Sequence, residues 1–219
     1  MTEMSASSVA ARADAFDDIE QQRGASVLGM WVFLATEILF FGVLFAGYAI
    51  CRIRFPEAFA AGSRQTDFAM GTLDTAVLLF SSCLAALAVR SVQLGARRSA
   101  VWLLMGTASL GCAFLLLHGI EYHDEYKQGL IPALRYDPAG HPPVAMALFF
   151  CLYYAITGFH SLHVAIGVVL LARLARMTAH GAFDRDYYAP VEVTALYWHL
   201  VDIVWIFVYP LLYLVGRAG

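Results

Sequence analysis

The chain has 219 residues, of which 60% are hydrophobic and only 14% are charged, and its formal net charge is −3. About 25% of the residues of an average soluble domain are charged, so this composition excludes an ordinary soluble protein. The basic residues form small clusters rather than a continuous stripe, and this pattern excludes nucleic acid as a partner.

Long apolar runs follow one another along the chain and predict its fold class. They cover residues 27–51, 71–89, 100–117, 144–171 and 193–215. A helix needs about 20 apolar residues to cross the hydrocarbon of a bilayer, and the runs lack the alternation of barrel strands. We therefore predict an all-α integral membrane protein, with a polar arm over residues 1–26 and a single domain of five transmembrane helices over residues 27–219.

The flanking charges predict the orientation of these helices. The arm, the 90–99 loop and the 173–190 loop share one side of the membrane and carry eight of the 14 Lys and Arg residues. Lys and Arg are enriched on the cytoplasmic side. We expect a cytoplasmic N-terminus, an external C-terminus and an external loop over residues 119–143.

Glu37 is the carboxyl group expected deepest in the bilayer. It stands eleven residues into the first run, which is about 15 Å from the start of that run at 1.5 Å per residue. A carboxylate at this depth costs about 2.5–3.5 kcal/mol unless it is paired or protonated. Two interpretations stay open, a proton-linked carboxyl and a hydrogen-bonding group between helices. By contrast, Asp74 falls in the first turn of the second run, where we expect it to cap the helix.

Histidines and acids occur in pairs three residues apart in the last two spans, His160 with His163 and His199 with Asp202. This spacing puts each pair on one helical face. Di-iron bundles use repeated Glu-x-x-His motifs, which neither pair offers. We therefore predict no metal site and no catalytic residue, and expect the histidines to bond to neighbouring helices or to backbone.

Other charged residues are expected near the ends of the last two spans. Glu192 follows Pro190 and fits the start of the fifth helix. Arg173, Arg176 and His180 lie at the end of the fourth span that we expect on the cytoplasmic side, where they would hold phospholipid headgroups or act as simple interfacial anchors.

Four motifs, in this order, carry a resemblance that covers residues 29–215: TEILFFGVLF, HGIEY, TGFHSLHVAIG and ALYWHLVDIVWIFVYPLLYL. The chain resembles subunit III of the haem-copper oxidases, which comprise cytochrome c and quinol oxidases. Matched position by position, the resemblance implies that Glu37 is the family's buried carboxyl, His160 and His163 its paired histidines, Glu121 its helix-end acid, and Glu192, Trp198, His199 and Asp202 its terminal-helix signature.

The resemblance implies a subunit of a proton-pumping oxidase that carries no redox centre of its own. Haem and copper are expected in the partner subunit I, against which the chain would pack with subunit II nearby. Its expected roles are to stabilise subunit I, to support proton uptake and to bind structural phospholipids, in the cytoplasmic (inner) membrane of a bacterium. Family members have seven helices or five. We expect the five-helix form, without the two helices that wall a lipid-filled cleft in the larger form.

Two alternatives remain from the sequence. One is the related small accessory subunit of a nitric oxide reductase, which shares these motifs. The other, from a different class, is a free-standing membrane metalloenzyme or transporter. The electron donor, cytochrome c or quinol, is not encoded in this chain, because the donor site would lie on other subunits.

Overall fold

The computed structural model describes residues 19–132, 135–136, 143–185 and 187–217, so most of the polar arm predicted over residues 1–26 lies outside the described residues. Within these ranges, five helices are long and apolar enough to cross a membrane, which confirms the predicted all-α class. They are α2 (Ile19–Arg54), α4 (Phe68–Gln93), α5 (Arg97–Lys127), α6 (Pro143–Ala179) and α7 (Ala189–Tyr209), which continues as the π-helix η1 (Pro210–Leu214).

Three short elements lie between the long helices. Helix α3 (Pro56–Gln65) follows α2, and the strands β1 (Leu130–Ile131) and β2 (Arg135–Tyr136) pair antiparallel between α5 and α6. The expectation of a loop over residues 119–143 is therefore wrong for its first part, because α5 continues to Lys127. Glu121 and Glu125 of that last stretch are buried against neighbouring helices, and this packing outweighs the polar local sequence.

Glycines end three of the long helices. Gly95, Gly129 and Gly181 have φ angles of +73°, +73° and +78° and follow α4, α5 and α6. This left-handed conformation is the usual way to close a helix, and glycine adopts it without a steric penalty. Proline begins α3 and lies in the first turn of α7, where its missing N–H is not needed.

Asp67, not Asp74, caps the start of α4. The Asp67 Oδ1 atom accepts hydrogen bonds from the backbone N–H groups of Ala69, at 2.8 Å, and Met70, at 3.1 Å. The helix begins before the apolar run does, so Asp74 lies inside α4 and is fully buried in the bundle. The prediction that Asp74 caps this helix is therefore wrong.

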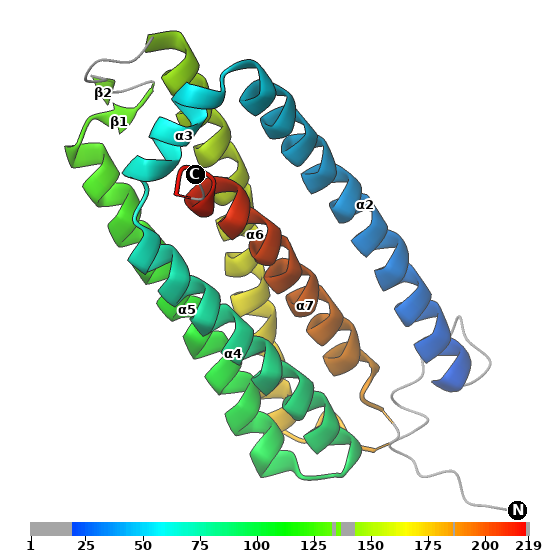
Figure 1. The fold of residues 1–219 in the computed structure, drawn as a ribbon. Helices are drawn as coiled ribbons and strands as arrows, with labels where there is room; N and C mark the ends of the chain where they lie inside the picture. The colour runs from blue at the N-terminus through cyan, green and yellow to red at the C-terminus, as the bar shows by residue number, and fades with distance from the viewer. Residues whose placement is uncertain (1–18, 133–134, 137–142, 186, 218–219) are drawn as a thin grey trace, which may run out of the picture.

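Helix α7 lies at the centre of the bundle and packs against α2, α4 and α6, while α5 closes the other side by packing against α4 and α6 (Figure 1). Helix α2 lies at the edge and presents apolar side chains outward, among them Leu28, Trp31, Leu39, Val43, Ile50 and Ile53. An exposed apolar surface of this kind suits a helix that faces lipid or another membrane subunit.

The connections alternate between the two ends of the bundle. The start of α2 and the α4–α5 and α6–α7 connections lie at one end, which we call the arm end (Figure 1). Helix α3, the strand pair and the end of η1 lie at the other, which we call the hairpin end. The sequence predicts the same grouping of loops. The cytoplasmic location of the arm end stays a prediction.

Trp198 of α7 packs at the place where α5 and α6 lie close to α7. Its indole is fully buried, and glycines of α5 and α6 lie against it. A Cβ atom added at Gly111 would lie 2.6 Å from Cη2 of Trp198, and one added at Gly167 would lie 2.7 Å from Cε3. Both distances are well inside van der Waals contact, so neither helix could approach α7 this closely with a side chain at these positions.

Replacing Gly167 by alanine tests this close approach. We expect Gly167→Ala to lower the stability of the detergent-solubilised protein by about 1–3 kcal/mol, because the new methyl group overpacks the indole. Thermal unfolding followed by circular dichroism measures the effect. Gly42→Ala is the control, because a Cβ at Gly42 meets nothing within 4 Å. Equal unfolding temperatures for the two variants would contradict the prediction.

Candidate functional site

Glu37 of α2 and His163 of α6 form a hydrogen-bonded pair near the middle of α2. The Oε2 atom of Glu37 lies 3.0 Å from Nε2 of His163, and the two side chains are 17% and 16% exposed. The other ring nitrogen, Nδ1, lies 2.7 Å from the carbonyl oxygen of Phe159. A carbonyl only accepts hydrogen bonds, so Nδ1 carries a hydrogen and donates it. Glu37 thus makes a hydrogen bond between helices, and its interpretation as a proton-linked carboxyl stays a prediction.

Aromatic side chains of α2 and α7 surround this pair. The ring of Phe41 lies 5.4 Å from that of His163, centroid to centroid. The hydroxyl of Tyr197 donates to the carbonyl oxygen of His163 at 2.9 Å. These contacts hold the imidazole in place and shield the pair on the side of the bundle.

The remaining paired residues bond to different helices and do not meet in one site. His160 is fully buried, and its Nε2 atom donates to the carbonyl oxygen of Val201 on α7 at 3.1 Å. The Nδ1 atom of His199 lies 2.7 Å from the hydroxyl of Ser82 on α4, and Asp202 is buried within the bundle. In the described part of the chain, neither pair belongs to a group of three metal-type ligands. The expectation that these histidines bond to neighbouring helices or backbone is confirmed.

The other residues that the resemblance singles out also link helices. Glu192 lies in the first turn of α7, as predicted, and accepts hydrogen bonds from Nε and Nη2 of Arg23 at 2.9 and 3.1 Å. Glu121 is buried in α5 and accepts a hydrogen bond from the hydroxyl of Tyr213 at 2.9 Å. The indole N–H of Trp198 donates to the hydroxyl of Ser81 at 3.0 Å.

Asp74 and His118 lie next to Glu121, and the sequence did not predict this group. The pairing of His118 with Glu121 was readable from their spacing of three residues within one helix. The contribution of Asp74 was not, because it comes from another helix and its apparent place at the helix start pointed to capping.

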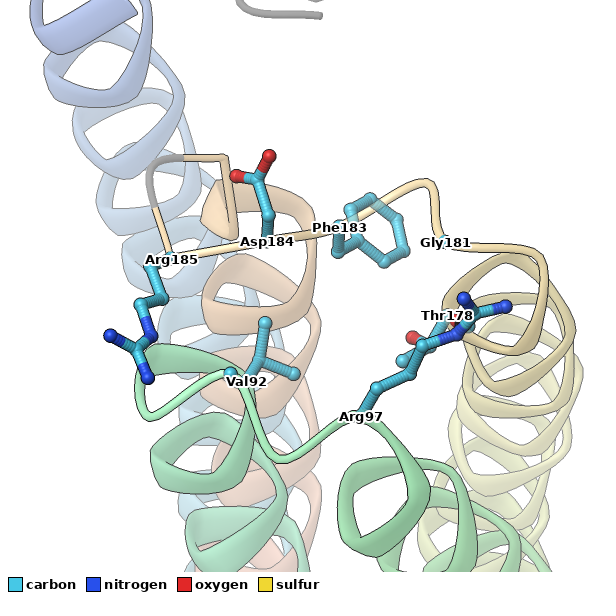
Figure 2. A pocket seen from close by; sticks show the side chains of 8 residues that line it. Val92, Arg97, Thr178, Gly181, Phe183, Asp184 and Arg185 are labelled. Carbon is cyan, nitrogen blue, oxygen red and sulfur yellow. Dashed lines mark hydrogen bonds between the residues drawn. The ribbon is translucent and has the colours of Figure 1, made fainter.

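A basic pocket of about 440 Å³ lies at the arm end, between the α4–α5 and α6–α7 connections (Figure 2). Arg97 and Arg185 approach it from opposite sides. The guanidinium of Arg97 donates to the carbonyl oxygen of Thr178 at 2.9 Å, and that of Arg185 donates to the carbonyl oxygen of Leu94 at 2.8 Å. These bonds tie the two connections together. The three residues predicted to hold lipid are exposed, Arg173 and Arg176 on α6 and His180 directly after it, and they do not line this pocket.

Comparison with known proteins identifies the family of this bundle. A family model described as cytochrome c oxidase subunit III matches residues 18–217. The chain belongs to the cytochrome c oxidase subunit III family. It is thus a non-catalytic subunit III of a haem-copper oxidase and an integral membrane protein associated with a terminal oxidase complex, as the four motifs indicate.

Relatives of this subunit III come from several kinds of oxidase. Subunit 3 of the cytochrome bo(3) ubiquinol oxidase of Pseudomonas aeruginosa is 29% identical over 201 residues, which cover 91% of this chain and 90% of the relative. Cytochrome c oxidase subunit 3 of Thermostichus vulcanus is 30% identical over 207 residues, or 93% and 94% of the two chains. A haem-copper oxidase subunit I+III of Aeropyrum pernix is 33% identical over 196 residues, which cover 85% of this subunit III and 22% of that longer protein.

Ser81 offers a test of the hydrogen bond that joins α7 to α4. We expect Ser81→Ala to destabilise the subunit by about 1 kcal/mol, because the buried indole N–H of Trp198 loses its acceptor. Thermal unfolding in detergent measures the change. Ser91→Ala is the matched control, because the hydroxyl of Ser91 bonds to the carbonyl oxygen of Leu87 within its own exposed turn. A control variant destabilised as much as Ser81→Ala would refute this account.

Proposed function

We propose that this subunit III packs against the catalytic subunit I, with subunit II in the same complex, and supports proton uptake during oxygen reduction. The haem and copper of the reaction belong to subunit I. The relative from Aeropyrum pernix supports the pairing, since its printed name joins subunits I and III. The apolar outer face of α2 supplies a surface suited to membrane-embedded contact.

The hydrogen bond between Glu37 and His163 is the observation that carries the proposed role in proton uptake. Because Nδ1 of His163 already donates to a carbonyl, the short contact between Nε2 and Glu37 needs one proton between them. That proton resides on the imidazole, giving two opposite charges, or on the carboxyl, giving two neutral groups. The pair therefore holds an exchangeable proton within the membrane, where ionisable residues mark proton pathways.

Glu37→Gln tests this role directly. Glutamine keeps the size of the side chain and a hydrogen bond to His163 but cannot exchange a proton as a carboxyl does. We expect an assembled complex with an unchanged haem spectrum, slower proton uptake and earlier inactivation during turnover. Stopped-flow measurement of proton uptake and the decay of oxygen consumption provide the readouts.

Glu57→Gln is the matched control, because Glu57 is an exposed acid on the short helix α3. We expect it to behave as the unmodified complex. If Glu37→Gln takes up protons at the normal rate and survives as many turnovers as the control, the pair has no part in proton uptake.

We place the subunit in a bacterial cytoplasmic membrane, with the arm end on the cytoplasmic side. Two exposed arginines of α6, Arg173 and Arg176, lie near that end together with His180. An arginine near an anionic membrane surface contributes about 1 kcal/mol of attraction. We infer that these residues hold phospholipid headgroups in the assembled complex.

Native mass spectrometry tests the lipid contact. We expect the double variant Arg173→Ala with Arg176→Ala to retain fewer anionic phospholipids than the unmodified complex. A double variant at the hairpin end of α2, Arg52→Ala with Arg54→Ala, removes the same charge elsewhere and serves as the control. Identical numbers of bound lipids in the Arg173 and Arg176 variant and in the unmodified complex would refute the lipid site.

A further inference from the structure

A buried group of three potential metal ligands lies between α4 and α5, and we call it the Asp74 cluster. It consists of Asp74 on α4 with His118 and Glu121 on α5. One ligand atom from each of these residues lies within 4.8 Å of those of the other two. All three are at most 3% exposed, so the group is closed off from its surroundings.

The two helices bring the cluster to one depth in the bundle. Asp74 lies six residues after the start of α4, and Glu121 lies six residues before the end of α5. At 1.5 Å per residue, each is about 9 Å inside the hairpin end of its helix. Because the chain turns back between α4 and α5, residues distant in the sequence come to the same level.

Most polar atoms of the cluster have no hydrogen-bond partner among the described residues. These are both oxygens of Asp74, both ring nitrogens of His118 and the Oε1 atom of Glu121. The Nδ1 atom of His118 lies 3.3 Å from Oε2 of Glu121 and 3.9 Å from Oδ2 of Asp74. Buried carboxylates without partners are costly. A positive ion between them would satisfy all three side chains at once.

We propose that the Asp74 cluster binds a divalent transition-metal ion of the Zn²⁺ type. A zinc ion with bonds of about 2.0–2.2 Å in tetrahedral geometry holds its ligand atoms about 3.3–3.6 Å apart. The 3.3 Å between His118 and Glu121 lies in this range, whereas the 3.9 Å between His118 and Asp74 requires the Asp74 carboxylate to shift slightly inward when the ion binds. One imidazole nitrogen and two carboxylate oxygens are common zinc ligands. Ca²⁺ and Mg²⁺ prefer oxygen ligands alone, so the histidine selects against them.

Neighbouring aromatic residues contact two of the three ligands, His118 and Glu121. The ring of His118 stacks on that of Phe114 at 5.7 Å between centroids and lies edge-on to Trp205 at 5.8 Å. The hydroxyl of Tyr213 donates to Oε2 of Glu121 and lies 3.2 Å from the hydroxyl of Tyr153. Hydrogen bonds to metal ligands, such as the one from Tyr213 to Glu121, orient the ligands and raise metal affinity. The ion would join α4 to α5 and, through Tyr213, to the C-terminal η1 segment.

Further polar groups lie on α5 between the Asp74 cluster and the end of the helix. One turn beyond the cluster, buried Glu125 accepts a hydrogen bond from Tyr154 at 2.8 Å. His123 and Asp124 lie exposed beside it, towards the hairpin end. The exposed groups would compete for zinc at the surface, so a test must separate their binding from that of the Asp74 cluster.

Metal analysis of the oxidase complex, purified through a tag on this subunit, tests the proposal. The complex is stripped with a chelator, incubated with Zn²⁺ and dialysed, and its zinc content is measured by mass spectrometry relative to its haem. We expect the unmodified complex to hold about one zinc ion more than Asp74→Asn or His118→Gln. X-ray absorption at the zinc edge of the unmodified complex should show one nitrogen and two carboxylate oxygens at the distances typical of zinc.

Two histidine variants serve as matched controls that should keep the ion. His199→Gln alters a histidine that bonds to Ser82, and His123→Gln removes the exposed histidine near the end of α5. Zinc that is lost in His123→Gln but kept in Asp74→Asn would show a surface site and overturn the proposal. Unmodified complex that takes up no more zinc than His118→Gln would also overturn it. If the Asp74 and His118 variants fail to assemble, the zinc content and X-ray absorption of the unmodified complex test the proposal alone. A complex that holds no zinc, or zinc without a nitrogen ligand, would refute the site.

Discussion

The packing of Trp198 determines how closely the helices of this subunit approach one another. Its indole lies between Gly111 of α5 and Gly167 of α6, and its N–H donates to Ser81 of α4. A single residue of α7 therefore contacts three other helices. Between helices in a membrane, association depends on close packing and on hydrogen bonds rather than on the hydrophobic effect. Here the close packing comes from small residues opposite one large aromatic side chain, and the hydrogen bond comes from the indole N–H.

Around this packed centre, two of the polar sites of the bundle differ in character. Glu37 and His163 lie where the edge helix α2 meets α6, and they are partly exposed to the membrane or to a neighbouring subunit. The Asp74 cluster is closed, lies near the hairpin end and involves only α4 and α5. The first arrangement suits proton exchange with a partner, and the second suits the binding of an ion that holds helices together.

Two predictions were wrong because hydropathy alone does not locate the start of α4 or the end of α5. Asp74 looked like a helix cap because the apolar run begins just before it, whereas α4 begins earlier, behind Asp67. The last turns of α5 looked like loop because they are rich in charged residues, yet Glu121 and Glu125 are buried there. A hydropathy pattern identifies segments that are apolar enough to lie in lipid. It does not identify polar residues that are buried between helices, because their burial depends on the neighbouring helices.

The sequence by itself determined the five spans, their alternating order, the family and the residues of its signature. These follow from the length of apolar segments that a bilayer requires and from motifs contained within single helices. Only the tertiary structure decided which polar groups meet. It brought Glu37 to His163 but separated His160 from His199, and it placed Asp74 against His118. The rotation of each helix about its axis decides these contacts, and that rotation is set by packing against neighbours that no local pattern specifies.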